Sequence, residues 1–346
     1  MPLVSVVIPS YNHARYIAAA VESVLNQTER DLELIVVDDG SKDNSLEILS
    51  TFSDPRLKIY PQENQGAHAA INHGLEQATG HYLAILNSDD LYFPIRLQKL
   101  IGILGQHPET GLVGSYIQVI DSEGVPLGIK HGYHDLEPWP LENRARSFRA
   151  GEDLRVVLLT ENYWSTTSNY LFSRSWFEKV GSFQPLHYAH DWDFALRLAV
   201  QSRLLLLPEP LLSYRVHATN TIKENQAAMI FEICWILAVH LPRAAKTDWF
   251  QSIDPNYRFD QLLNSIHVFG CERILSLMLL QSLSERPDLA SDLLHPDNPL
   301  RAAYLEYIQN QLLKAPKEPS PGLQNGPIKS FLARLAKRAK RDSPKA

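Results

Sequence analysis

The chain has few cysteines, no basic leader and no long uncharged apolar run, and each shortage argues against a class of protein. Cys234 and Cys271 are its only cysteines, too few for a disulfide framework and not at metal-site spacing, as is typical of a reducing compartment. The first residues, MPLVSVVIPSYN, lack a basic start, so we expect no secretory signal. The most apolar stretch, Ala227 to Leu241, is about 15 residues long and contains Glu232 and His240, whereas a membrane helix needs about 20 apolar residues. We therefore expect a soluble protein.

Positive charge is scarce outside the C-terminal end. The net charge of the 346 residues is -6. From residue 326 onward, seven lysines and arginines stand against one aspartate, which gives this end +6 and leaves -12 for the preceding 325 residues. A nucleic-acid-binding protein normally places positive charge on its folded body. We therefore expect no nucleic-acid partner.

Apolar runs alternate with helical periodicity over the first 120 residues. Short apolar runs predict strands at 3–8, 32–37, 57–60 and 82–86, the first two of them buried. Helices are predicted between them: one around Ile17 with Asn12 as its cap, one from about Lys42 with Ser41 as its cap, and one over 70–78 that stops at Gly80. This alternation predicts an α/β fold, a mostly parallel sheet with helices on both faces.

The chain becomes helical in pattern beyond residue 214. We expect a helical C-terminal region over 223–314, followed over 315–346 by a Pro-rich linker and a basic tail. Within 328–341, apolar residues fall on one helical face and basic residues on the other, the composition of an amphipathic helix lying on an anionic membrane. A solvated, disordered tail is the alternative, and both stay open.

Acidic residues follow two of the predicted strands. Asp38 and Asp39 come after the second strand, and Asp89 and Asp90 after the fourth. Parallel sheets bind ligands at the carboxyl ends of their strands. No strand is followed by the glycine-rich dinucleotide motif or by a phosphate-binding P-loop. Carboxylates without such a loop suggest a divalent cation that bridges a diphosphate, whereas the alternative is that they only end strands and cap helices.

Nine short motifs occur in the order and spacing of one enzyme family. They are Val4-Ser-Val-Val-Ile-Pro-Ser-Tyr-Asn12, Ser23-Val-Leu-Asn-Gln-Thr28, Glu33-Leu-Ile-Val-Val-Asp-Asp-Gly-Ser41, Glu63-Asn-Gln-Gly66, Leu86-Asn-Ser-Asp-Asp90, Val180-Gly-Ser-Phe183, His190-Asp-Trp-Asp193, Arg197-Leu198 and Tyr214-Arg-Val-His217. Over roughly residues 3–220 the chain thus resembles the family-2 inverting glycosyltransferases of GT-A fold. The resemblance implies a Rossmann-like glycosyltransferase domain over 1–222, with a nucleotide-sugar-binding half (1–110) and an acceptor half (111–222).

The resemblance implies roles at the nucleotide. Pro9 and Tyr11 would line the base, with Tyr11 stacked on it. Asp39 would accept a hydrogen bond from the imide N–H of uracil or thymine, and Asp38 would shape the same pocket. The alternatives are a half-buried surface aromatic at Tyr11 and a simple turn residue at Asp39.

The resemblance also implies that a second loop of the chain lines the donor site. Asn64 and Gly66 match a loop that lines the donor site in the family. Ile71 stands where the family often has arginine, so a contact to the donor is predicted to be missing.

The resemblance also implies a metal site for Mn2+ or Mg2+. Asp89 and Asp90 match the Asp-x-Asp region that holds the ribose and the metal. Asn87 replaces the first acid of that motif, which leaves open which side chain touches the metal. His217 would approach the diphosphate or the metal; the alternative is a structural histidine at a strand end.

Asp191 matches the catalytic base of the family. Apolar residues recur at helical spacing from Trp192, so a helix begins near His190 with Asp191 in its first turn, where the helix dipole favours an ionised carboxylate. Such a carboxylate can take the proton of an acceptor hydroxyl; the alternative is a helix N-cap. His190 replaces a frequent glutamate of the family, and Asp193 is expected to act only through its neighbours.

The resemblance as a whole implies a metal-dependent transferase. It would move a sugar from a nucleotide diphosphate donor, UDP- or dTDP-sugar, to the hydroxyl of a saccharide or lipid-linked acceptor in cell-surface polysaccharide or glycolipid biosynthesis. Asn87 and Ile71 favour the rival, a catalytically silent GT-A-like protein that binds a glycan or a partner. We expect a cytoplasmic location, with contact to the inner face of the membrane if residues 328–341 bind lipid.

Overall fold

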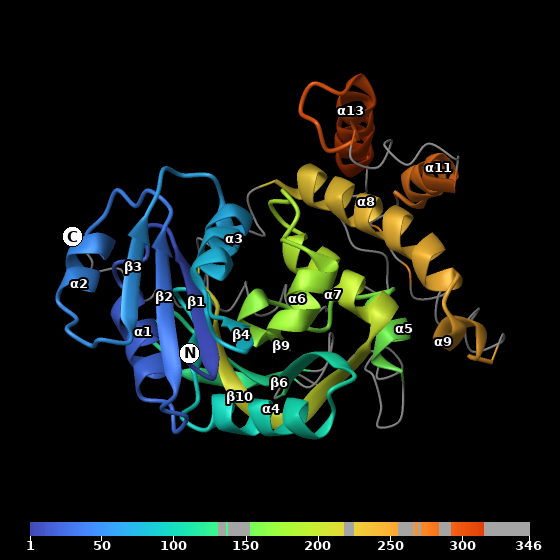
Figure 1. Cartoon of the computed structure of the whole chain (residues 1–346). Helices are drawn as coiled ribbons and strands as arrows, with labels where there is room; N and C mark the ends of the chain where they lie inside the picture. Colours follow the sequence, from blue (N-terminus) through green and yellow to red (C-terminus); the bar gives the residue numbers. More distant parts are fainter. Residues whose placement is uncertain are drawn as a thin grey trace.

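The computed structural model describes residues 1–130, 136–137, 153–217, 225–254, 266, 268, 271–283 and 292–314. Its centre is one sheet of ten strands: β1 (Val4–Ser10), β2 (Leu32–Asp38), β3 (Leu57–Pro61), β4 (Tyr82–Ile85), β5 (Leu91–Tyr92), β6 (Thr110–Ile120), β7 (Pro126–Lys130), β8 (Leu136–Glu137), β9 (Leu171–Ser173) and β10 (Arg203–Arg215). The order is β3-β2-β1-β4-β9-β6-β10-β5, and β7 and β8 extend from β6 (Figure 1). The first four strands run parallel, as do β6 and β10, whereas the short strands β5, β7, β8 and β9 pair antiparallel.

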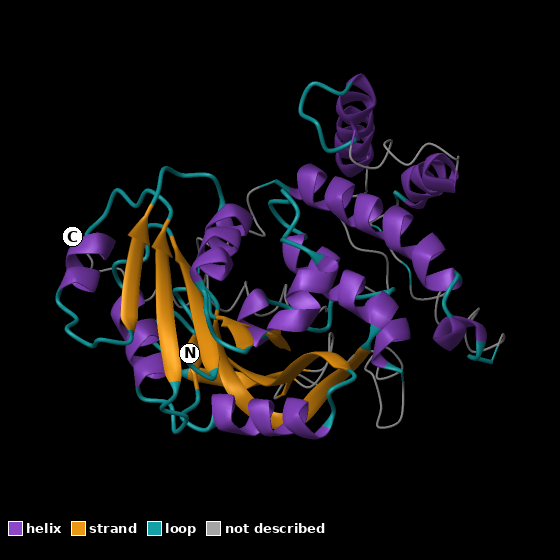
Figure 2. Cartoon of the chain, in the orientation of Figure 1, coloured by secondary structure: helices purple, strands orange, loops and turns teal. Residues whose placement is uncertain are grey.

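Helices cover both faces of this sheet (Figure 2). One face carries α1 (Ile17–Leu25), α2 (Ser45–Ser50) and α4 (Arg96–Gln106), and the other carries α3 (Ala67–Gln77), α6 (Arg174–Val180) and α7 (His190–Gln201). A short helix, α5 (Leu154–Leu158), and a 3-10 turn at Thr167–Asn169 precede β9. The predicted α/β class with helices on both faces is confirmed.

Neighbouring residues of β1 and β2 face opposite layers. Val7 and Val37 are fully buried in the cluster that contains α3 and α7, whereas Val6, Ile8 and Val36 are fully buried in the cluster that contains α1 and α4. Side chains alternate across a strand, so a strand covered on both faces needs apolar residues at every position. This explains the continuous apolar runs by which the sequence predicted these strands.

The predicted caps of the first two helices are wrong. α1 begins after Tyr16 and α2 after Asn44, several residues beyond the predicted caps Asn12 and Ser41. Instead, the Asn12 side chain accepts from the N–H of Lys42 at 2.7 Å, and the Ser41 hydroxyl accepts from the N–H of Asn12 at 2.9 Å. Both polar side chains therefore join the loops that follow β1 and β2, because those loops leave backbone donors at the same sheet edge.

The predicted helical C-terminal region is confirmed. It contains α8 (Gln226–Ala245), α9 (Asp248–Gln251), α11 (Glu272–Leu283) and α13 (Pro299–Lys314), and α8 packs on α7, α11 and α13 (Figure 1). Among the described residues, α8 is the one helix long and apolar enough to cross a membrane by length and composition. The expectation that the stretch Ala227 to Leu241 is too short to cross a membrane is wrong for the whole helix, which has 20 residues. Burial is the better guide: 67% of its most apolar window is buried inside the protein, as in a core helix.

Two predicted features fall outside the described residues. One is the linker and basic tail over 315–346, including 328–341, and the other is the junction near 222 where the transferase domain is predicted to end. The domain limits therefore stay predictions.

Gly114 in β6 allows a close approach of a buried tryptophan. A Cβ atom at residue 114 would lie 2.0 Å from the ring of Trp164, which is fully buried. We expect Gly114→Ala to lower the free energy of unfolding by about 1–3 kcal/mol or more, because a packed core tolerates extra volume poorly. Gly102→Ala on α4 is the matched control: nothing lies within 4 Å, and alanine favours helix by up to about 1 kcal/mol. Urea unfolding of both variants tests this, and a Gly114→Ala protein as stable as the wild type would contradict it.

Candidate active site

The predicted site residues gather where parallel strands end. Asp38 is the last residue of β2 and pairs in register with Ser10, the last residue of β1. The segment Asn87–Asp90 follows β4, which pairs with β1 on its other side. Three loops thus meet at the carboxyl edge of the sheet, where such folds bind ligands.

Three side chains at this edge lie close enough together that they could hold a metal ion. His13, Asp89 and His217 each offer one ligand atom, and these atoms lie within 4.8 Å of one another. His217 Nε2 lies 2.9 Å from Asp89 Oδ2. Two neighbouring ligands of an octahedral ion at 2.1 Å are about 3.0 Å apart, so this spacing fits a metal that both would bind. The structure thus brings together Asp89 and His217, as predicted, and adds His13, which sequence reasoning missed.

The ring of His13 is held in place by the acidic loop itself. Its Nδ1 lies 2.6 Å from the hydroxyl of Ser88. Burial lowers the pKa of His13, and the negative charge of Asp89 opposes part of that shift. A neutral imidazole whose second nitrogen is hydrogen-bonded is the form that binds metals. No signal in the sequence distinguishes His13 from a surface histidine after Asn12.

Asp90 lies outside this triad, and its role as a metal ligand stays a prediction. It is fully buried, its Oδ2 accepts from the Ser168 hydroxyl at 2.5 Å, and its Oδ1 accepts from the N–H of Arg215 at 2.8 Å. Burial and the charge of neighbouring Asp89 raise the pKa of Asp90 well above its usual range. Its side chain ties the acidic loop to β10 and to the turn before β9.

The structure explains why an amide, and not a carboxylate, stands at residue 87. Its amide nitrogen donates to the Thr166 hydroxyl at 3.0 Å, and its carbonyl oxygen accepts from the Thr167 hydroxyl at 2.9 Å. A carboxylate could accept but not donate, so the amide suits two hydroxyl partners whose roles differ. The replacement of the family's first acid therefore does not remove a ligand from the triad.

The predicted nucleotide residues gather around Asp39, which is almost fully buried. Its Oδ1 accepts from Gln62 Nε2 at 2.8 Å and from the N–H of Gln65 at 2.9 Å, while its Oδ2 accepts from the N–H of Gly66 at 2.8 Å. Asn64 donates to the Asp39 carbonyl at 3.0 Å, and Gly66 has a φ of 91° that favours glycine. The structure thus brings Asn64 and Gly66 to Asp39, which fixes the loop before α3. Its contact with a base stays a prediction.

The other nucleotide residues differ in exposure. Tyr11 is 42% exposed, so its ring is available for stacking, and Pro9 is buried inside β1 next to it. Asp38 is fully buried: its Oδ1 accepts from the N–H of Ser41 at 2.9 Å, and its Oδ2 has no hydrogen-bond partner among the described residues. Their roles at the nucleotide stay predictions.

The structure explains why residue 71 is an isoleucine, where the family often has arginine. Ile71 is fully buried on α3 in the same core cluster as Val37, so this position faces the sheet and not the site. His68, one turn earlier, is half-buried, and burial and the charges of His190 and His187 lower its pKa, opposed by Asp39. His68 thus lies within electrostatic reach of Asp39 and of the start of α7.

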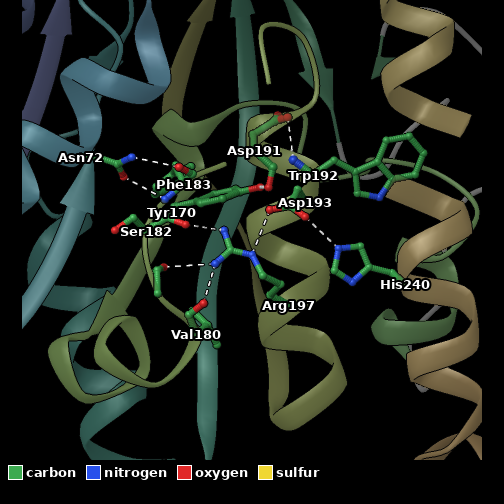
Figure 3. Close-up of polar contacts among 11 residues, drawn as sticks. Asn72, Tyr170, Val180, Ser182, Phe183, Asp191, Trp192, Asp193, Arg197 and His240 are labelled. Carbon is green, nitrogen blue, oxygen red and sulfur yellow. Dashed lines mark hydrogen bonds and ion pairs between the residues drawn. The ribbon is translucent and has the colours of Figure 1, made fainter. Parts of the chain in front are cut away.

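Asp191 lies in the first turn of α7 and is 8% exposed. Its Oδ2 accepts from Asn162 Nδ2 at 2.9 Å, and its Oδ1 accepts from the N–H of Trp192 at 2.7 Å. The Tyr170 hydroxyl donates to the Asp191 carbonyl at 2.7 Å (Figure 3). Side chain and backbone are therefore both held, as a base needs. The N-cap alternative is not supported, since α7 is preceded by Ala189 as its cap.

A half-buried lysine, Lys130, lies within electrostatic reach of Glu161 and Asp191. Burial lowers the pKa of Lys130 to about 8, and the charges of Glu161 and Asp191 oppose that shift. Its ammonium group hydrogen-bonds to the hydroxyl of Ser165. Lys130 ends β7 in the irregular middle of the chain, where no pattern of the sequence pointed to it.

Comparison with known sequences gives one family. A family model described as Glycosyl transferase family 2 matches residues 5–181. An uncharacterized glycosyltransferase of Nostoc sp. is 31% identical over 225 residues, 63% of this chain and 66% of the Nostoc protein. Chondroitin synthase of Escherichia coli is 32% identical over 201 residues, 58% of this chain and 27% of that protein. The matched part thus spans less than two thirds of the length of either relative.

Solved structures agree on the fold. TarS 1-349 of S. aureus in complex with UDP-GlcNAc superposes with a TM-score of 0.57 and 18% identity, covering 90% of this chain and 88% of that one. Mannosyltransferase PcManGT from Pyrobaculum calidifontis, in complex with GDP-Man and Mn2+, gives a TM-score of 0.54 and 19% identity over 90% and 86% of the two chains. At such identities the similarity demonstrates a common GT-A fold, and what these proteins bind is a property of theirs.

Proposed function

Because this chain belongs to glycosyl transferase family 2, we propose that it moves a sugar from a UDP- or dTDP-sugar to an acceptor hydroxyl, with inversion and with a divalent cation. The observation that carries the proposal is the meeting of His13, Asp89 and His217 within 4.8 Å at the ligand-binding edge of the sheet. Neighbours of the same fold bind UDP, UDP-GlcNAc and GDP-Man, which supports a nucleotide-sugar donor.

The ligand set also favours one class of cation. His13, Asp89 and His217 would hold the ion, which when bound offsets the negative charge of the leaving diphosphate. Mg2+ prefers oxygen ligands and keeps its waters, whereas Mn2+ is the first member of the first-row series whose affinity extends to mixed nitrogen and oxygen sites. Of the two predicted cations, Mn2+ therefore matches two imidazoles and one carboxylate better than Mg2+.

In the proposed reaction, Asp191 is the base that takes the proton of the acceptor hydroxyl. As the acceptor oxygen forms its bond to the anomeric carbon, its proton passes to the Asp191 carboxylate, and the bond between that carbon and the diphosphate breaks with its electron pair on the β-phosphate oxygen. Asn162 and the N–H of Trp192 hold the two carboxylate oxygens, so the base does not have to reorient during the reaction.

The nucleotide pocket follows from the loops around Asp39. The exposed ring of Tyr11 would stack on the base, next to Pro9. Asp39 accepts from three donors, Gln62 Nε2 and the N–H groups of Gln65 and Gly66, and its one remaining lone pair would accept the imide N–H of uracil or thymine. Asp38 would support the same pocket from β2.

Asn87 and Ile71 no longer favour the alternative of a catalytically silent binding protein. Asn87 serves Thr166 and Thr167, and Ile71 belongs to the core, so neither marks a lost catalytic group. We further propose a saccharide or lipid-linked acceptor in polysaccharide or glycolipid synthesis, supported by the similarity to chondroitin synthase. A cytoplasmic location with membrane contact through residues 328–341 completes the proposal.

A donor screen tests this function. The protein is incubated with UDP-, dTDP- and GDP-sugars in Mn2+, Mg2+ or a chelator, and release of the nucleoside diphosphate is measured. We expect hydrolysis of a UDP- or dTDP-sugar that is fastest in Mn2+ and absent with chelator. Titration calorimetry with UDP and Mn2+ measures binding separately. Equal nucleotide affinity with and without chelator would contradict the metal, and turnover confined to GDP-sugars would contradict the base contact.

A further inference from the structure

Two polar side chains interrupt the apolar sequence of α8, and both contact α7 or the turn that leads into it. Glu232 is 5% exposed and His240 is fully buried. They are eight residues apart, a little over two turns of helix. Burying a carboxylate and an imidazole is costly unless each is hydrogen-bonded, so their partners indicate why an otherwise apolar helix carries them.

Glu232 binds the turn that leads into α7. Its Oε1 accepts from the N–H of His187 at 2.9 Å, and its Oε2 accepts from the N–H groups of Tyr188 and Ala189 at 2.7 and 3.0 Å. Ala189 is the N-cap of α7, two residues before Asp191. Backbone donors at a helix start have no partner within the helix, and a carboxylate there is favoured by the helix dipole. Glu232 thus fixes the start of the helix that carries the proposed base.

His240 binds α7 on the other side of Asp191. Its Nε2 lies 2.8 Å from Asp193 Oδ1, and Asp193 Oδ2 accepts from Arg197 Nε at 2.9 Å (Figure 3). Arg197 in turn donates to the carbonyl groups of Val180 and Ser182 at 2.6 and 2.8 Å. An ionised carboxylate can only accept, so Nε2 of His240 carries the proton of this hydrogen bond.

Asp191 lies between these two anchor points, at residues 187–189 and 193. We propose that Glu232 and His240 are positioning residues of the transferase reaction, through which α8 sets the orientation of the Asp191 carboxylate toward the acceptor. This inference rests on the proposed role of Asp191 as the base. It gives the helical C-terminal region a direct part in catalysis: the first turn of α7 keeps its geometry only while α8 is docked. A displacement of about 1 Å at a reacting group can cost about a hundredfold in rate.

Substitutions in the full-length protein test the proposal. Glu232→Gln keeps the size of the side chain but replaces one acceptor oxygen by a donor, and His240→Leu removes the donor to Asp193. We expect each to lower kcat by about tenfold or more while the affinity for UDP in Mn2+ changes by less than about twofold. His240→Gln places an amide N–H near the position of Nε2 and should restore most of kcat.

The controls separate positioning from mere folding. Ser282→Ala removes a comparable contact of α8, the 2.7 Å hydrogen bond to the Ala238 carbonyl from α11, and should leave kcat unchanged. In an Asp191→Asn background, Glu232→Gln should lower the residual rate by less than about twofold, because the group it positions is gone. Loss of UDP binding together with kcat, or no recovery in His240→Gln, would mean a structural role only and overturn the inference.

The two proposals fail differently. Wild-type kcat in Glu232→Gln and His240→Leu, with Asp191→Asn inactive, would overturn the inference and leave the proposed function intact. A fully active Asp191→Asn protein would overturn the proposed function itself.

Discussion

Asp191→Asn is expected to lower turnover by at least about a hundredfold and to leave donor affinity nearly unchanged. An amide cannot take the proton of the acceptor hydroxyl, whereas the donor is bound by loops on β1, β2 and β4. The carbonyl oxygen of the new side chain can still accept from the N–H of Trp192, so the first turn of α7 should stay formed. Steady-state kinetics with the donor from the screen give kcat, and calorimetry with UDP and Mn2+ gives the affinity.

Asp248→Asn is the matched control. Asp248 also lies in the first turn of a helix, α9, but it is exposed and outside the site. The same chemical change there should leave kcat within about twofold, since surface substitutions away from special features have small effects. Near-normal turnover in Asp191→Asn would remove this residue from the mechanism.

Asp89→Ala is expected to weaken Mn2+ binding by at least about a hundredfold and to reduce UDP affinity to the value measured with chelator. It removes the one carboxylate of the triad, and charged oxygen ligands contribute most to binding a divalent ion. His13→Ala and His217→Ala should weaken Mn2+ binding by about ten- to a hundredfold each. Electron paramagnetic resonance counts free Mn2+ directly, so the result does not depend on activity.

Glu22→Ala is the control for Asp89→Ala, because it also removes one negative charge. Glu22 is an exposed carboxylate on α1, and its loss should not change Mn2+ affinity. If His13→Ala bound Mn2+ as the wild type does, the triad would reduce to Asp89 and His217. If Asp89→Ala kept full affinity, the metal site proposed here would be wrong.

The sequence by itself was enough for the four parallel strands at the start of the chain and for the position of most predicted site residues. Strands covered on both faces require unbroken apolar runs, so β1, β2 and β4 could be located, and the carboxyl edge placed Asp38, Asp39 and Asp89 correctly. The helical period from Trp192 located the start of α7 and put Asp191 in its first turn. These features depend on residues near one another in the chain, which a local pattern can report.

Tertiary structure alone decided which polar side chains meet. Asp89 and Asp90 are adjacent in the sequence, but their side chains contact different segments. Asp89 faces His217, which follows β10, whereas Asp90 is buried against Ser168 and the backbone of β10. Glu232 and His240 counted in the sequence only as interruptions of an apolar run, and their partners lie more than 40 residues away. Hydrogen bonds and metal ligation depend on distances of a few ångströms between segments remote in the chain. Because neither hydrophobic period nor composition encodes such distances, only the folded chain determines them.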